Sequence, residues 1–139
     1  MLNAPNSRVL TASVPAQGTA GTAQDQVVGE SPVTGEVTEV VIYPEANLTA
    51  NASNFRTFRL LNKGLDGNGA VVVASFATDT VTADDLADFD EKGIPLSVVA
   101  GAVNVTEGDI LAMDETVGGT GVAHSGYGVK VTVSKVVSS

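Results

Sequence analysis

The feature that most constrains this chain is a regular alternation near its C-terminal end. Residues 129–134 read VKVTVS, so every second residue is Val and the residues between them are polar. Successive side chains of a β-strand point to opposite faces, and this spacing therefore predicts a half-buried antiparallel strand. Val is stiff at its first side-chain torsion and packs well on a pleated surface. A chain rich in Val is thus expected to fold around sheets rather than helices.

A hairpin is predicted in the middle of the chain. NFRTFRLLN (54–62) and AVVVASFAT (70–78) read as strands, and the segment between them contains an Asp-Gly and an Asn-Gly pair. In the first of these strands Arg56 shares a face with Phe58 and Leu60, while Arg59 lies on the other face. Arg residues among apolar ones suggest faces that are only partly covered.

Further strands are expected on both sides of this hairpin. GEVTEVVIYP (35–44) reads as a strand that ends at Pro44, which cannot donate to a ladder. The apolar segment 94–103 follows later, and a turn at Glu107-Gly108-Asp109 precedes another strand. Counting gives about six or seven strands over residues 35–139, which predicts an all-β domain, a small antiparallel β-sandwich or barrel.

At most one short helix is expected, near residues 83–91. Thr82 can cap it, Asp85 takes the capping-box position, Leu86 and Phe89 share a face, and Gly93 can end it. A structured acidic loop is the alternative.

Residues 1–34 differ from the rest and are predicted to form an extended or disordered N-terminal arm. They are rich in Ala, Thr, Ser, Gly, Gln and Pro and contain no aromatic residue. Such a segment alone buries too little apolar surface to offset its backbone entropy. Two apolar pairs with one neighbouring cation could anchor it on a partner. These candidate contact residues are Arg8, Val9, Leu10, Val27 and Val28.

Composition excludes several classes of function. Seven basic and sixteen acidic residues give a formal charge of −9, which repels nucleic acid and anionic membrane surfaces. There is no Cys, and hence no disulfide or thiolate metal site. No apolar stretch is long enough for a membrane helix, and the first residues do not read as a secretory signal. We therefore expect a cytoplasmic, unprocessed chain.

Catalytic, cofactor and metal sites are not predicted. His124 is the single His, and its sequence neighbour Ser125 is poorly placed for proton transfer, so a His in a Gly-rich loop is the simpler interpretation. The acidic run at 84–91 and the segment Asp66-Gly67-Asn68-Gly69 hint at calcium. Both are better read as a solvated acidic face and a tight turn, and no enzyme activity is expected.

The segments NFRTFRLLNKGLDGNGAVVVASFAT and VTEGDILAMDETVGGTG, with the closing VKVTVSK strand, resemble small virion proteins of tailed bacteriophages. Within that group the similarity is greatest to head decoration and head-fibre proteins, and it covers about residues 35–137. The resemblance implies a structural protein that binds the outside of a capsid. It further implies contacts with the major capsid protein, trimers, stabilisation of the shell, and assembly in the host cytoplasm.

Two other functions stay open. A carbohydrate-binding or adhesin-like β-sandwich is one, although the chain has no Trp to stack on sugar rings. A structural protein of the tail or baseplate is the other, and it differs mainly in where the protein sits.

Overall fold

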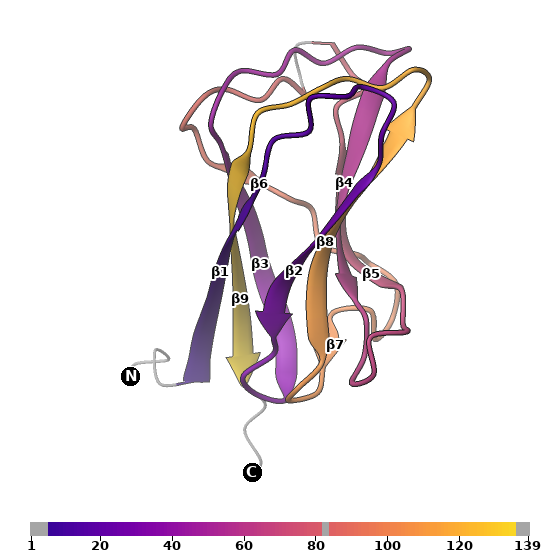
Figure 1. Cartoon of the computed structure of the whole chain (residues 1–139). Coiled ribbons are helices and arrows are strands. Elements are labelled where there is room, and N and C mark those ends of the chain that lie inside the picture. Colours follow the sequence, from indigo (N-terminus) through magenta and orange to yellow (C-terminus); the bar gives the residue numbers. More distant parts are fainter. Residues whose placement is uncertain (1–5, 82–83, 136–139) are drawn as a thin grey trace.

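The computed structural model describes residues 6–81 and 84–135, which form a sandwich of two antiparallel sheets (Figure 1). The strands are β1 (Ser7–Val14), β2 (Gln24–Glu30), β3 (Gly35–Pro44), β4 (Phe55–Asn62), β5 (Val71–Ala77), β6 (Lys92–Gly93), β7 (Asn104–Val105), β8 (Ile110–Gly118) and β9 (Tyr127–Lys135). The first sheet has the order β1-β9-β3-β6, with β7 also on β3, and the second has the order β2-β8-β4-β5. The predicted β-sandwich is confirmed.

The alternating segment 129–134 lies in β9, at the centre of the first sheet. Its three Val side chains are at most 2% exposed and point to the interior, where they meet the inner face of the second sheet. That face is formed by residues such as Phe58, Leu60, Leu111 and Met113. The alternation arises because β9 has one face on this core and the other on solvent.

The predicted hairpin is also confirmed, because β4 and β5 pair antiparallel from Thr57–Ala77 to Asn62–Val71. Its connection uses the expected turn chemistry. The Asn62 side chain accepts the Gly64 amide, the Asp66 side chain accepts the Asn68 amide, and Gly67 has a φ of 80°.

No helix forms among the described residues, so the alternative of a structured acidic loop is correct for residues 84–91. The backbone N–H and C=O of Leu86 form two hydrogen bonds of 2.9 Å with the backbone of Leu48. They are therefore not used in a helical turn. Phe89 is 78% exposed at φ 58° and does not share a buried face with Leu86. Thr82 lies outside the described residues, and none of the described elements is a helix that could span a membrane.

The predicted boundary at residue 34 needs correction, because much of the proposed arm belongs to the sandwich. β1 pairs with β9 over eight residues, and β2 pairs with β8, so residues 7–30 supply one edge strand to each sheet. In isolation, this segment would be too polar to fold. An edge strand gains its ladder and one apolar contact face from its neighbour, and few apolar residues are enough for that.

Candidate functional site

The five predicted contact residues lie on the two edge strands β1 and β2, which run beside each other on one side of the sandwich (Figure 1). Val9 is 54% exposed and Val27 is 58% exposed, so both are available on the surface. Leu10 and Val28 are partly buried and pack against the core. Exposed Arg8 donates from Nη1 to the Ser7 carbonyl at 3.1 Å. The structure thus separates surface residues from core residues within the predicted set.

A groove of about 230 Å³ adjoins β2 on the outer face of the second sheet. Its buried floor includes Leu61 and Ala112, and Val27 and Ile110 contribute to its walls. Lys63 and Asp25 also line it and supply one charge of each sign. The groove is an apolar recess large enough for one or two aliphatic side chains of a partner. The sequence did not reveal it, because its lining comes from three separate strands and the hairpin loop.

Three charged residues form a row across the same outer face. Asp114 on β8 lies opposite Asp25 on β2 and opposite Arg59 on β4 in the pairing of these strands. A hydrogen bond with Asp114, followed by burial and the negative charge of Asp114, raises the pKa of Asp25. Burial alone would raise the pKa of Asp114 as well. Hydrogen bonds with Asp25 and Arg59, together with the positive charges of Arg59 and Lys63, instead hold the pKa of Asp114 below its ordinary value.

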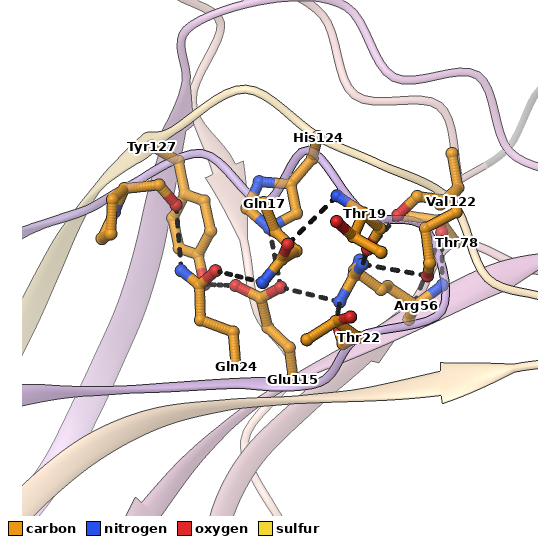
Figure 2. Close-up of polar contacts among 12 residues, drawn as sticks. Gln17, Thr19, Thr22, Gln24, Arg56, Thr78, Glu115, Val122, His124 and Tyr127 are labelled. Atoms are coloured by element: carbon orange, nitrogen blue, oxygen red, sulfur yellow. Dashed lines mark hydrogen bonds and ion pairs between the residues drawn. The ribbon is translucent and has the colours of Figure 1, made fainter.

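A second polar cluster, which includes Arg56, is buried near the loops at one end of the sandwich (Figure 2). The Arg56 side chain is fully buried and donates to four backbone carbonyls. Nε donates to Val122 at 2.7 Å, Nη1 to Thr22 at 2.7 Å, and Nη2 to Thr19 and Ala20 at 3.1 Å each. Arg56 therefore ties the loop between β1 and β2 to the loop before β9.

Glu115 completes this buried polar cluster from β8. Its Oε1 lies 3.4 Å from Arg56 Nη1 and 2.7 Å from His124 Nε2, and its Oε2 accepts the Tyr127 hydroxyl at 2.8 Å (Figure 2). Burial, and then the negative charge of Glu115, raise the pKa of Tyr127, which keeps the hydroxyl a hydrogen-bond donor. The ring of Phe58 packs edge-on against His124 and Tyr127.

The geometry of this cluster is that of a structural clasp, meaning a group of buried side chains that holds loops in place. Both ring nitrogens of His124 face acceptors, Glu115 at one and the Ser125 carbonyl at the other, and the side chain is only 4% exposed. No buried side-chain polar atom among the described residues lacks a partner. The interpretation of His124 as a simple loop residue missed this cluster. The one available signal was Arg56, whose position in the alternation places it on the inner face with Phe58.

The acidic segments suspected of calcium binding use their carboxylates within the loops. Asp84 accepts the Thr80 amide and Asp85 accepts the Ala50 amide, at 2.8 and 2.7 Å. Hydrogen bonds from the backbone amide and then from the side chain of Asn68 lower the pKa of Asp66. Across the described residues, no group of three or more potential metal ligands is assembled.

Comparison with known proteins found similarity to solved structures. No family model matches the chain, and no curated protein matches it. A chain of the Cyanophage Pam1 capsid asymmetric unit is similar over 92% of this chain and 82% of that chain, with a TM-score of 0.51 and 20% identity. A phage capsid chain shares this fold.

Two further structures show weaker similarity. FLHE is similar over 92% of this chain and 96% of that chain, with a TM-score of 0.46 and 15% identity. A chain of infectious bursal disease virus, Gx strain, is similar over 92% of this chain and 32% of that chain, with a TM-score of 0.43 and 11% identity. At these identities the likeness concerns the fold alone.

Proposed function

We propose that this protein is a structural, non-catalytic virion protein that binds the outer surface of a tailed-phage capsid and stabilises the shell. The observation that carries the proposal is the similarity, over 92% of the chain, to a chain of the Cyanophage Pam1 capsid asymmetric unit. The resemblance of three sequence segments to head decoration proteins supports the same proposal and does not depend on the fold.

The distribution of polar groups supports a role in binding rather than chemistry. The hydrogen bonds of the buried cluster of Arg56, Glu115, His124 and Tyr127 hold loops together. The recess on the second sheet is lined mainly by aliphatic groups and offers a contact surface. A charge of −9 keeps many copies soluble when they crowd together.

The proposed partner is the major capsid protein, with homotrimers as the expected oligomeric state. A small domain with a Val-rich core gains stability when copies bury further surface against one another or against a shell. Val9, Val27 and the groove beside Val27 are the surface features suited to such contacts. Assembly onto shells in the host cytoplasm follows from this role.

Purified virions provide the test. Particles banded on a density gradient are probed with antibody to this chain, and gold-labelled antibody locates it by electron microscopy. We expect labelling over the head. We also expect that release of the protein lowers the temperature at which shells rupture. Labelling confined to tails would assign the tail or baseplate alternative, and absence from washed virions would reject a virion role.

A further inference from the structure

The two sides of the sandwich differ in how their sheet edges are paired, and the side formed by β5 and β3 is partly covered by a later segment. The segment 92–105 runs along it. The backbone amide of Ser75 donates to the Pro95 carbonyl and that of Ser97 to the Val73 carbonyl, at 3.1 and 2.8 Å, which occupies the middle of the outer edge of β5. β6 and β7 pair with β3, with an additional bond from Ile94 to Val40, which closes the edge of β3.

The opposite side of the sandwich is formed by β1 and β2, and each of these strands pairs on one flank only. β2 carries features that oppose pairing with another strand. Its register shifts between Val27 and Gly29, which is a bulge, and it carries the carboxylates of Asp25 and Glu30. Bulges and charges on an edge strand are known means of preventing further strand addition.

β1 has neither a bulge nor a carboxylate, and its one charged residue is Arg8 at the start of the strand. Its eight residues pair with β9 without a register shift, and the strand contains no acidic residue and no Pro. In an antiparallel pair only every second residue directs its N–H and C=O at the partner, so about half of the backbone groups of β1 face away from β9. Among residues 6–81 and 84–135, no backbone hydrogen bond reaches that outer edge from another segment.

Side chains along β1 define what could pair there. Leu10 and Ala12 lie on the inner face, opposite Val131 and Val129, and remain partly exposed at the rim of the core. Val9, Thr11 and Ser13 lie on the outer face. A strand added beside β1 would extend the core if its inward positions were aliphatic, and would face small or β-branched neighbours on the other side.

Charge argues that the added strand comes from another protein. Each copy of this chain carries a net charge of −9, so a second copy at β1 would meet the same like-charge repulsion that trimer contacts have to overcome, whereas a neutral or basic segment would not. A neutral or basic segment is therefore favoured by the field of the whole protein, whereas an acidic one is not.

We propose that β1 is the acceptor edge for strand addition by an extended, neutral-to-basic segment of a partner protein, with aliphatic residues at alternate positions. Main-chain hydrogen bonds would provide affinity and the alternate side chains specificity. That this segment belongs to the capsid shell rests on the proposed function, whereas the acceptor edge itself does not.

The test uses the full chain and a peptide of the stated chemistry. The peptide YGVKVTVSK, which copies residues 127–135 and carries two Lys, has inward Val residues at alternate positions and no acid. Amide hydrogen exchange is followed with and without it. We expect slowed exchange at alternate residues of β1, unchanged exchange in β2, and no effect from a peptide of the same composition with the alternation removed.

Two matched variants locate the site, because Val9 and Val27 are almost equally exposed on neighbouring edge strands. Val9→Lys is expected to weaken peptide binding by about two- to fivefold, and Val27→Lys to leave it unchanged within error. Equal weakening by both, no binding to the native protein, or slow exchange along the whole of β1 in dilute monomer would overturn the proposal.

Sedimentation equilibrium distinguishes self-association of this chain from binding of a foreign segment. A dimer of the native chain that Val9→Lys abolishes would make a second copy the occupant and reject the foreign segment. Failure of the peptide experiment would not affect the proposed location in virions. Absence of the protein from virions would not affect the peptide result, so the virion role and the acceptor edge at β1 can fail separately.

Discussion

Arg56 on β4 and Glu115 on β8 form an ion pair with Nη1 and Oε1 3.4 Å apart, and their side chains are 0% and 1% exposed. Isolation from water makes such a pair costly to break, because removal of one partner leaves the other charge without compensation. The Arg56 guanidinium also holds four loop carbonyls, including those of Thr19 and Thr22 between the two edge strands. The pair therefore connects the core to the segment that carries β1 and β2.

Arg56→Met is expected to lower the free energy of unfolding by about 3–5 kcal/mol, since it leaves Glu115 without its buried cation and four carbonyls without a donor. Arg59→Met is the matched control on the same strand, because Arg59 pairs with Asp114 on the solvent side at 31% exposure. Its cost is expected to stay below about 1 kcal/mol. Urea denaturation measures both, and equal costs would contradict the assignment of Arg56 as a buried clasp.

Gly121 is expected to tolerate no side chain. It has a φ of 74°, and a Cβ there would lie 2.0 Å from the Ala20 carbonyl oxygen. Gly121→Ala should therefore cost about 2 kcal/mol or more, from strain and displacement of the loop that Arg56 holds. Gly18→Ala, in the loop between β1 and β2 and with nothing within 4 Å of an added Cβ, should be neutral or slightly stabilising. Thermal unfolding compares the two, and similar melting temperatures would argue against this loop packing.

Asp25→Asn is expected to stabilise the protein slightly at neutral pH. The folded state raises the pKa of Asp25 above 3.8, so Asp25 favours folding most when protonated and its contribution declines as pH rises through the folded pKa. Asn cannot ionise and avoids that decline. Because Asp25 is largely exposed, the gain in Tm should be on the order of 1 °C at pH 7 and fade near about pH 3. A gain that grew on acidification would contradict the sign.

Neighbouring residues of β1 should respond differently to truncation. Leu10 packs against the core, whereas Val9 is 54% exposed. Leu10→Ala is expected to cost about 1–2 kcal/mol, less than a fully buried Leu, and Val9→Ala less than about 0.5 kcal/mol. Equilibrium unfolding of the free protein is the measurement. Negligible cost for Leu10→Ala would restore the idea of a separate N-terminal arm.

Local patterns were sufficient to predict the strands with strong periodicity or turn signals. β9 follows from the VKVTVS alternation, the β4–β5 hairpin from its Asp-Gly and Asn-Gly pairs, and the end of β3 from Pro44. These features depend on side-chain direction and turn preferences within a few residues. The helix considered near 83–91 was wrong for the described part of that segment, because the pairing of Leu86 with Leu48 is a long-range contact that outweighs local capping.

By itself, the sequence determined that the protein is an acidic, all-β domain with Val-rich strands, because periodicity, turn chemistry and net charge are properties of the chain alone. Only the tertiary structure decided that residues 7–30 are edge strands and that Arg56, Glu115, His124 and Tyr127 meet. It also decided that, within residues 6–81 and 84–135, β1 pairs on one flank only. These outcomes depend on which strands become neighbours, and that is set by the burial of both sheets against each other, a contact between residues far apart in the chain.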